Sequence, residues 1–325
     1  MWKIKDLELK NRIVIAPMAG ISNPAFRSIV KNYQPALIYS EMISDKAIVY
    51  KNIKTIEMTR VLPDEHPMGL QLFGEDIDSL VKAAVYLDQN TNCDVIDINM
   101  GCPVPKIVKG SGGASLMKTP DHAFKIVEEI VKEIQKPLTV KTRLGWDEAH
   151  LNVVEMAMGL EKAGASAIAI HGRTRGAMYS GEARFDLIRQ VKANAKIPII
   201  ANGDITSLAK AKEVLEITKA DAIMIGRGVL GQPWFIEELI KGLNDEPYVM
   251  IDIQERFNIA RMHALKLIEF KGEEIALKEM RGHLSWYLKG LPNSHKVKEG
   301  ISMMKSYVEF DRILKDYAAS FSLAE

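Results

Sequence analysis

Residues 137–173 read PLTVKTRLGWDEAHLNVVEMAMGLEKAGASAIAIHGR, and this stretch decides the fold class. Its two outer runs, PLTVKTR (137–143) and AIAIHGR (167–173), are short and apolar and end in turn signals, so each predicts a buried strand. Between them, NVVEMAMGLEKAG repeats apolar side chains every three or four residues, which predicts an amphipathic helix. A strand, a helix and a second strand in this order indicate a unit with parallel strands.

The same alternation extends over the first 230 residues or so of the chain. Six further strand-like runs are RIVIAP (12–17), ALIYSE (36–41), PMGLQLFG (67–74), VIDINMG (95–101), IPIIANGD (197–204) and DAIMIGRG (221–228). Eight strands alternating with helices predict an α/β fold of the closed (β/α)8 type, a TIM barrel. An open doubly wound sheet is disfavoured because the first turn, PMAGISNPAF, lacks G-x-G-x-x-G.

The strand-like runs stop near residue 242, and the rest of the sequence has helical periodicity. Three stretches carry this pattern, at 251–270, 273–291 and 297–318. Gly, Asn, Asp and Pro in GLNDEPY (242–248) mark a boundary before them. We therefore predict a catalytic barrel over residues 1–242 and a small C-terminal all-helical domain over residues 243–325.

Composition narrows the class of protein. The chain has 325 residues, 26% of them charged, and a net charge of only +1, so no global field draws it to nucleic acid or an anionic membrane. Its two cysteines, Cys93 and Cys102, form no CxxC pair, which argues against a disulfide scaffold or a structural zinc site. No uncharged run reaches the ~18 residues that a membrane span requires. We expect a soluble, cytoplasmic protein with no obligate protein partner.

Polar residues and turn glycines gather where the predicted strands end. The carboxyl ends of barrel strands carry the reacting groups in proteins of this fold. The residues at these ends are Pro17, Met18, Ala19, Gln71, Asn99, Cys102, Lys141, Arg143, His171, Arg173, Asn202, Asp204, Gly226 and Arg227. Carboxylates and histidines are too few among them for a closed coordination sphere, so no metal site is predicted.

Several of these residues suit a flavin. The loops ANGD (201–204) and GRG (226–228) follow the seventh and eighth strands, where barrels commonly bind phosphate. The amide of Gln71 can pair with the edge of a flat heterocycle, and Lys141 can hold negative charge on a reduced isoalloxazine ring. Together these groups predict FMN. Each one alone also has a structural interpretation, as a turn glycine or a rim lysine in a salt bridge, so the prediction depends on their joint placement.

The chain closely resembles the dihydrouridine synthases, flavoenzymes that reduce uridine in RNA, and especially their bacterial B subgroup. The resemblance covers nearly the whole chain and is carried by APMAGISNPAFR, LQLFG, INMGCPVPK, VKTRLGWD, IHGRTR, ANGDI, IGRGVLGQPW and MRGHLSWYLKG. It implies that the FMN contacts are Pro17, Met18, Ala19, Gln71, Lys141, His171, Asn202, Gly203, Asp204, Gly226 and Arg227. Two positions depart from the family pattern: Phe185 stands where many members have tryptophan, and Gly282 where many have a basic residue.

The resemblance also implies that Cys102 is the proton donor. Reduction of the C5=C6 bond of uridine requires a hydride at C6, from N5 of reduced FMN, and a proton at C5. A thiol with an ordinary pKa of ~8.5 is protonated near neutral pH and can supply that proton. NADPH is the transient reductant that the family implies. The alternative for Cys102 is a buried, inert thiol, which is the role we expect for Cys93.

RNA is the expected partner, with transfer RNA preferred and ribosomal RNA left open. The target uridine must leave its stack to reach the barrel. Expected RNA contacts are Asn99, Arg143, Arg173, Arg175, Arg281 and Lys289. Between Lys278 and Lys298 five Lys or Arg residues face one acid, Glu279, with aromatic residues interleaved. Without the resemblance, an ordinary solvated helix face would be the better interpretation of this stripe.

Three rival functions stay open on the sequence. One is an FMN oxidoreductase of a free pyrimidine or enone, although such an enzyme needs no helical tail. Another is an aldolase that forms a Schiff base with Lys141, which would leave Cys102 and Gln71 without a role. The third is a non-catalytic RNA-binding protein that has kept the barrel.

Overall fold

The computed structural model describes residues 1–322, which form two compact units. The barrel unit comprises Met1–Asn23 and Pro35–Gly226, and the helical unit comprises Pro24–Gln34 together with the described residues from Arg227 onward. The boundary expected at residue 242 stays a prediction, because compactness divides the chain earlier and adds the Pro24–Gln34 segment to the helical unit.

Eight parallel strands close into a barrel, which confirms the predicted TIM barrel. In chain order they are β3 (Ile13–Ile15), β4 (Leu37–Ser44), β5 (Met68–Phe73), β6 (Val95–Asn99), β7 (Leu138–Arg143), β8 (Ala167–His171), β9 (Ile199–Asn202) and β10 (Ala222–Ile225). Each strand pairs with its neighbour in sequence, and β10 pairs with β3 to complete the circle. All eight strands fall within the runs of sequence that predicted them, except that β4 continues to Ser44.

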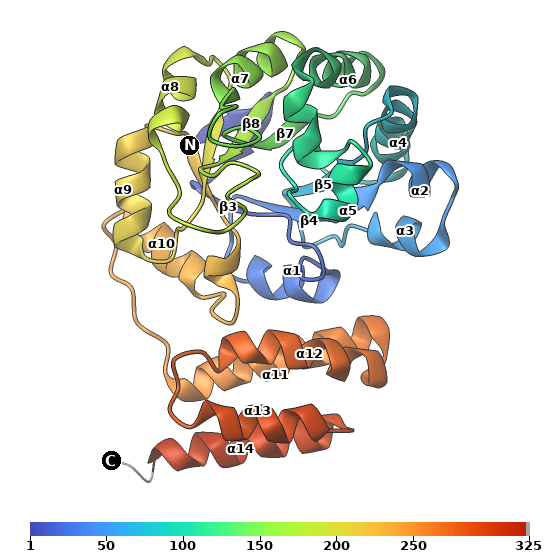
Figure 1. The fold of residues 1–325 in the computed structure, drawn as a ribbon. Helices are drawn as coiled ribbons and strands as arrows, with labels where there is room; N and C mark the ends of the chain where they lie inside the picture. The colour runs from blue at the N-terminus through green and yellow to red at the C-terminus, as the bar shows by residue number, and fades with distance from the viewer. Residues whose placement is uncertain (323–325) are drawn as a thin grey trace. The chain divides into compact units, whose positions relative to one another are not determined.

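Helices surround the strands of the barrel unit (Figure 1). They are α2 (Asp45–Val49), α3 (Ile53–Met58), α4 (Ile77–Asn90), α5 (Pro105–Lys109), the 3-10 helix η1 (Gly113–Lys118), α6 (Pro120–Glu133), α7 (Val153–Lys162), α8 (Asp186–Asn194) and α9 (Leu208–Thr218). The longer ones bury an apolar stripe against the sheet. In α6, for example, Ala123, Ile126, Val127 and Ile130 are fully buried.

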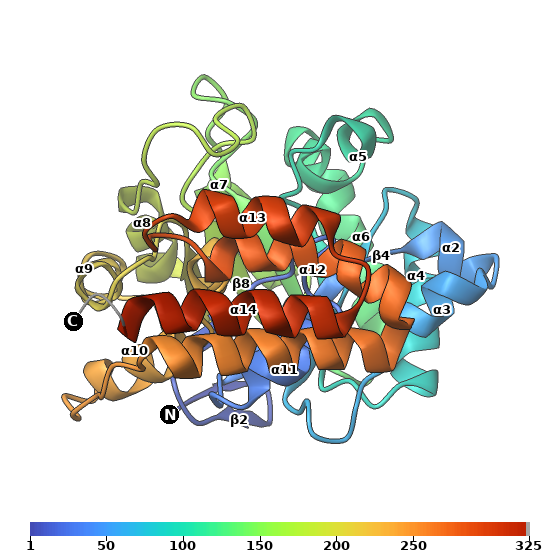
Figure 2. The ribbon, with the colours of Figure 1, turned by 90° about the horizontal axis from the view of Figure 1, so that it is seen from below.

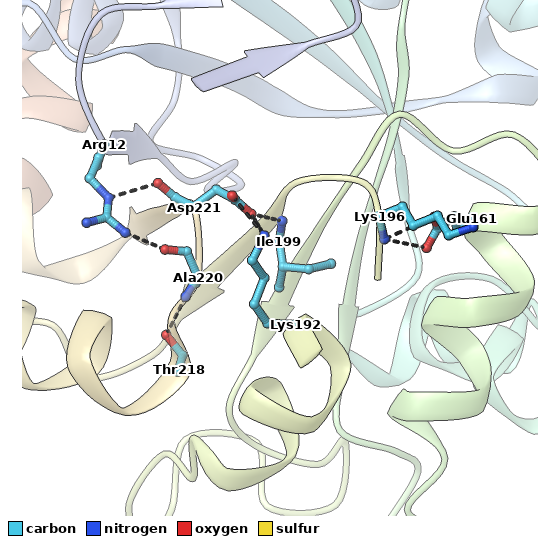
Figure 3. A network of polar contacts seen from close by, with 8 residues as sticks. All are labelled: Arg12, Glu161, Lys192, Lys196, Ile199, Thr218, Ala220 and Asp221. Atoms are coloured by element: carbon cyan, nitrogen blue, oxygen red, sulfur yellow. Dashed lines mark hydrogen bonds and ion pairs between the residues drawn. The ribbon is translucent and has the colours of Figure 1, made fainter. Parts of the chain in front are cut away.

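The amino ends of the strands are closed by contacts that the sequence did not predict. A short hairpin, β1 (Trp2–Ile4) and β2 (Leu7–Leu9), places Ile4 and Leu9 in the apolar core at this end. Around the start of β10, the Asp221 carboxylate accepts hydrogen bonds from Lys192 Nζ and from the Ile199 N–H (Figure 3). Arg12, just before β3, donates to the backbone carbonyls of Ala220 and Asp221. This end of the barrel therefore serves stability, and the opposite end remains for chemistry.

The helical unit is all-helical apart from its connections, as predicted. Its elements are α1 (Pro24–Lys31), the 3-10 helix η2 (Arg227–Val229), α10 (Phe235–Leu243), α11 (Ile253–Lys271), α12 (Glu273–Tyr287), α13 (Ser294–Met303) and α14 (Tyr307–Ser322). Helices α11 and α14 lie side by side (Figure 2), and their buried Phe257 and Phe310 belong to one core with Met280 and Leu284 of α12. None of the helices in residues 1–322 is long and apolar enough to cross a bilayer.

One helical stretch of the sequence proves to be two helices. The pattern at 297–318 is interrupted between α13 and α14, where Ser306 Oγ accepts a hydrogen bond from the Glu309 N–H. The Glu309 carboxylate in turn accepts the Lys305 N–H at 2.8 Å. This reciprocal capping satisfies backbone donors at the start of α14 and lets the chain reverse there.

Candidate active site

Strand register brings the predicted site residues of the barrel unit to one end. Gln71 of β5 pairs with Asp97 of β6, and Asn99, two residues further along β6, pairs with Lys141 of β7. On the other side of the barrel, His171 of β8 pairs with Asn202 of β9. Side chains two residues apart on a strand point to the same face, so the Asn99–Lys141 pair lies one step closer to the carboxyl ends than the Gln71–Asp97 pair.

Two buried amides meet inside the barrel. Asn99 Nδ2 donates to Gln71 Oε1 at 2.8 Å, and Gln71 Nε2 donates to the Asp97 carboxylate at 2.6 Å. The side chains of Gln71 and Asn99 are 1% and 8% exposed, so their polar atoms depend on these partners rather than on bulk water. Gln71 keeps one N–H and one lone pair for a ligand's edge.

The loop after β6 holds Cys102 by its backbone. Asn99 Oδ1 accepts the N–H of Gly101 at 3.1 Å and that of Cys102 at 2.8 Å. The carbonyl of Cys102 accepts the Ala114 N–H at 3.1 Å, so the loop folds back on itself. Gly113, with φ +57°, permits this approach, because a Cβ there would lie 2.9 Å from the Cys102 carbonyl oxygen. The thiol therefore stands on a fixed backbone.

The two cysteines have different surroundings. Burial raises the pKa of the Cys102 thiol, and the Val104 N–H, Arg143 and Lys141 partly oppose that rise. Cys102 is half-buried and protonated at neutral pH, as a proton donor must be. Cys93 is buried, and burial raises its pKa to about 11, so it is an inert thiol of the interior.

Lys141 is a cation with no counterion of its own. Within residues 1–322, its ammonium makes no hydrogen bond and no ion pair to another side chain. Burial and then the Arg143 guanidinium lower the pKa of Lys141 to about 8, while the Asp97 carboxylate opposes them. A partly desolvated ammonium with unused donors is a site for an anionic ligand, so this residue fits the anionic, reduced form of a flavin.

The glycines after β9 and β10 differ in what they require. Gly203 has φ +131°, and a Cβ there would lie 2.8 Å from the Ala183 side chain, so the fold itself needs glycine. At Gly226 a Cβ would meet only Met18 Sδ at 3.6 Å and an alanine methyl at 3.7 Å. That backbone is therefore open to the approach of a ligand, which fits a phosphate. Asn202 Nδ2 donates to the Met224 carbonyl at 2.7 Å and orients the end of β9.

Three predicted site residues hold loops together. Arg173 is 4% exposed and donates from both terminal nitrogens to the Asp204 carboxylate, each at 2.7 Å. Arg143 is 3% exposed and donates to the carbonyls of Gly101, Thr174 and Met178. These contacts fix the loops that surround Cys102. A direct RNA contact of either arginine, or an FMN contact of Asp204, stays a prediction.

Arg175 belongs to a basic and aromatic cluster that the sequence only half predicted. Its guanidinium lies 4.4 Å from the centroid of Trp146, and Lys118 Nζ lies 4.8 Å from the same ring. Trp146 and Lys118 were missed because they stand on different connections, after β7 and at the end of η1. Cations over an aromatic face are suited to a nucleotide, since the ring can stack and the charges can bind phosphate.

The remaining predicted residues lie in the helical unit or beside the site. Lys289 Nζ is 5.6 Å from the Trp286 centroid, and Arg281 donates to the Met304 carbonyl at 3.1 Å. Arg281 and Lys298 line a small groove on α12 and α13 with the apolar floor of Leu284 and Ile301. Arg227 follows Gly226 directly and begins η2.

The loop after β3 presents Pro17, Met18 and Ala19. Ser22 braces it, because its Oγ accepts the Met18 N–H at 3.1 Å and donates to the Ala16 carbonyl at 3.3 Å. Pro17 and Met18 are half-buried, whereas Ala19 is exposed. Met18 also lies beside Gly226, so the loops after β3 and β10 meet, as the FMN prediction requires.

Sequence reasoning missed the polar residues below the two amides. Asp97 accepts from Gln71 and from Thr139, and Thr139 in turn contacts the Tyr39 hydroxyl at 3.0 Å. An available signal was the acid inside the otherwise apolar run VIDIN, since a carboxylate in a central strand must find partners. No group of three His, Cys, Asp or Glu side chains suited to a metal occurs in the part of the chain that the structure describes.

The sequence is similar to proteins of one family. The family model for "Dihydrouridine synthase (Dus)" matches residues 14–322. The "Probable tRNA-dihydrouridine synthase" of Rickettsia conorii is 38% identical over 306 residues, which cover 94% of this chain and 92% of that protein. The "tRNA-dihydrouridine synthase B" of Pasteurella multocida is 40% identical over 294 residues, covering 90% and 88% of the two chains.

A solved structure supports the architecture alone. The complex of 2-naphthoyl-CoA reductase with 2-naphthoyl-CoA matches with a TM-score of 0.57 at 13% identity. The match covers 75% of this chain and 52% of the reductase chain, so it is a likeness of fold.

Proposed function

Because the chain belongs to the dihydrouridine synthase family, in its B subgroup, we propose that it reduces the C5=C6 bond of uridine in transfer RNA, with FMN as cofactor and NADPH as transient reductant. The observation that carries the proposal is the placement of a protonated thiol and a lysine at one end of the barrel: Asn99 accepts the Cys102 N–H and is the register partner of Lys141. An oxidoreductase of this kind needs both groups at one barrel mouth.

The residues that would hold FMN come from six strands and the loops that follow them. Gln71 and Lys141 would meet the ring, and the open backbone at Gly226 with Arg227 would meet the phosphate. Pro17, Met18, Ala19, His171, Asn202, Gly203 and Asp204 complete the proposed set. When bound, reduced FMN supplies the hydride that C6 of the uracil ring receives, and NADPH restores the reduced form.

Cys102 would give its thiol proton to C5 of the base. Burial keeps the thiol protonated before the reaction, and the Arg143 and Lys141 charges stabilise the thiolate that the transfer leaves behind. Solvent then returns a proton to the sulfur. The same surroundings therefore serve both states of the sulfur, which is what a general acid requires over a full cycle.

The RNA would be held by cations beside aromatic rings. In the barrel unit these are Arg175 and Lys118 with Trp146, and in the helical unit Lys289 with Trp286. Phosphate contacts of this kind fix position, and a flipped uridine then enters the mouth near Asn99. Arg281 at its groove is a further proposed contact.

The test is an absorbance titration in one anaerobic cuvette. We expect the purified protein to carry a flavin spectrum that bleaches with NADPH and returns when unmodified transfer RNA is added. Return of the spectrum with free uridine or an enone instead would favour a small-molecule oxidoreductase. A colourless protein that FMN cannot reconstitute would overturn the proposal.

Substitution of the thiol tests the proton step separately. Cys102→Ala should bind FMN and accept electrons from NADPH as the parent does, yet lose at least about 100-fold in turnover on RNA, since general-acid catalysis contributes on the order of 10² to 10⁴. Cys93→Ala is the matched control and should keep full turnover. Full activity of Cys102→Ala would remove the thiol from the reaction.

A further inference from the structure

Beneath the candidate active site, a chain of hydrogen bonds crosses the barrel interior from β4 to the Cys102 loop. Its members, in order, are Tyr39, Thr139, Asp97, Gln71, Asn99 and the N–H of Cys102. Each link measures between 2.6 and 3.0 Å, and all five side chains are 8% exposed or less. The family's proposed chemistry uses Gln71 and Cys102 and leaves Asp97 without a role.

The direction of every link follows from the Cys102 end. A backbone N–H can only donate, so the N–H groups of Gly101 and Cys102 require the oxygen of the Asn99 amide. Asn99 must then donate from Nδ2 to Gln71 Oε1. Gln71 must in turn donate from Nε2, and the acceptor is one oxygen of Asp97.

At the Tyr39 end of the chain, Asp97 must also accept a hydrogen bond. Thr139 donates its hydroxyl proton to the second carboxylate oxygen at 2.6 Å, so Thr139 Oγ1 must accept from the Tyr39 hydroxyl. Glycine at position 69 makes room for this arrangement, because a Cβ there would lie 2.4 Å from the Tyr39 ring. Both oxygens of Asp97 accept, which only the ionised carboxylate does without loss.

We propose that Asp97 is a positioning residue: its buried carboxylate fixes which way the amides of Gln71 and Asn99 face and thereby holds the backbone of the Cys102 loop. The proposal rests on the proposed function only in that Gln71 and Cys102 face the flavin and the base. Reversal of one amide would set two donors against each other in the dry interior and release the Cys102 N–H from its acceptor.

Burial disfavours the negative charge of Asp97, whereas its hydrogen-bond partners and a nearby cation stabilise it. Burial raises the pKa of Asp97 to about 6, against the opposing effects of the Thr139 and Gln71 hydrogen bonds and of the Lys141 ammonium. The other titratable group that faces it, Tyr39, stays neutral because burial raises the pKa of its hydroxyl. Asp97 is therefore ionised at neutral pH, and the network has its full set of acceptors there.

The test moves the carboxylate from position 97 to position 71, the next member of the hydrogen-bond chain. Asp97→Asn puts a donor where an acceptor is required, so either one link breaks or the Thr139 hydroxyl reverses and leaves the Tyr39 hydroxyl proton without an acceptor. In the double variant Asp97→Asn with Gln71→Glu, the new amide can accept from Thr139 and donate to the new carboxylate, which also accepts from Asn99. Every hydrogen bond up to Cys102 is then restored with its original direction beyond position 71.

The readout is the rate at which iodoacetamide alkylates Cys102 in FMN-free protein, with Cys93→Ala as background so that one thiol remains. We expect Asp97→Asn to change this rate by at least about fivefold and the double variant to return it to within about twofold. Thr139→Val, which removes a donor on the far side of Asp97, should lower the unfolding temperature but leave the rate within about twofold. FMN and RNA take no part, so failure here is separable from failure of the proposed function.

The contrary outcomes are equally definite. If Asp97→Asn lowers the unfolding temperature and leaves the alkylation rate unchanged, Asp97 is structural only. If the double variant recovers the unfolding temperature but not the rate, the amides do not position the loop. Where Asp97→Asn fails to fold, the double variant decides alone: folded protein with the parent's rate supports the proposal, and an unfolded double variant overturns it.

Discussion

The charge of Lys141 has opposite effects on the stability of the cofactor-free protein and on its affinity for an anionic ligand. Its pKa of about 8 lies below the ordinary 10.5, so the charged form is disfavoured in the cofactor-free fold. The unfolded chain then binds more protons than the folded one between these values, and stability without cofactor rises as pH increases from about 8 toward 10.5. The affinity for an anionic ligand has the reverse dependence, because it needs the ammonium.

We therefore expect FMN binding to weaken as pH rises through about 8 while the cofactor-free protein becomes more stable. Fluorescence titrations with FMN and thermal unfolding of the cofactor-free protein, both at pH 7 and pH 9, measure the two trends. In Lys141→Gln the Kd at pH 7 should rise about tenfold or more, as for loss of one charge-assisted contact, and both trends should flatten. Lys132→Gln, whose ammonium is paired with Glu128 and Glu129 on α6, should behave as the parent. Parallel trends would contradict this account.

At this scale the sequence predicts residue types better than their contacts. Gln71, Lys141 and Cys102 could be chosen because polar groups at the ends of apolar strands stand out. The orientation of the Gln71 amide could not be predicted from the sequence. It depends on Asp97 and Asn99, which lie 26 and 28 residues away along the chain. The pairing of Arg173 with Asp204 could not be predicted either, because charge alone does not reveal a partner 31 residues further along the chain.

The strands of the barrel could be predicted because most of their residues are buried on both faces and their runs are largely apolar, as in AIAIH of β8. The hairpin β1–β2 escaped notice because its strands are three residues long and carry charges on their exposed side. The break between α13 and α14 escaped for another reason: its capping residues, Ser306 and Glu309, continue the helical period in sequence. The spacing of apolar residues indicates which side chains an element buries, but it does not indicate where the backbone turns.

Two glycines of the helical unit provide a matched pair. Gly231 has φ +68°, and a Cβ there would lie 2.1 Å from the Trp286 carbonyl carbon at the end of α12. Gly231→Ala should therefore cost ~3 kcal/mol or more, from a left-handed backbone and a clash with main chain that cannot move aside. Gly282, inside α12, has nothing within 4 Å of the position that an alanine methyl group would take, so Gly282→Ala should stabilise by ~0.5 to 1 kcal/mol.

Urea unfolding followed by circular dichroism and by tryptophan fluorescence measures both changes. The opposite signs are the point of the comparison, because both substitutions add the same methyl group to a glycine. Equal effects of the two substitutions would show that the approach of η2 and α12 is looser than the structure has it.

For the whole molecule, charge is balanced and binding of RNA has to be local. The net charge of +1 provides no general attraction to a polyanion. Each lysine that meets a phosphate should then be visible in the salt dependence of binding. Lys289→Gln is expected to reduce the slope of log Kd against log salt by about 0.7 to 0.9, the value for one phosphate contact.

Filter binding of unmodified transfer RNA between 50 and 200 mM salt would measure that slope. Lys132→Gln again serves as the control, because its charge is already neutralised within α6. An unchanged slope in Lys289→Gln would assign this lysine to the Trp286 surface and not to the RNA.

The pairing of β3 with β10 has a consequence for how the protein is made. Ile13 and Ile223 are partners in the sheet, so the barrel cannot close until β10 has been synthesised and can pair with β3. A ribosome that adds ~5 to 20 residues per second needs roughly 10 to 40 s to travel from one to the other. During that interval the nascent chain exposes two unpaired strand edges, and chaperones that shield such edges would have their main task before residue 225 emerges.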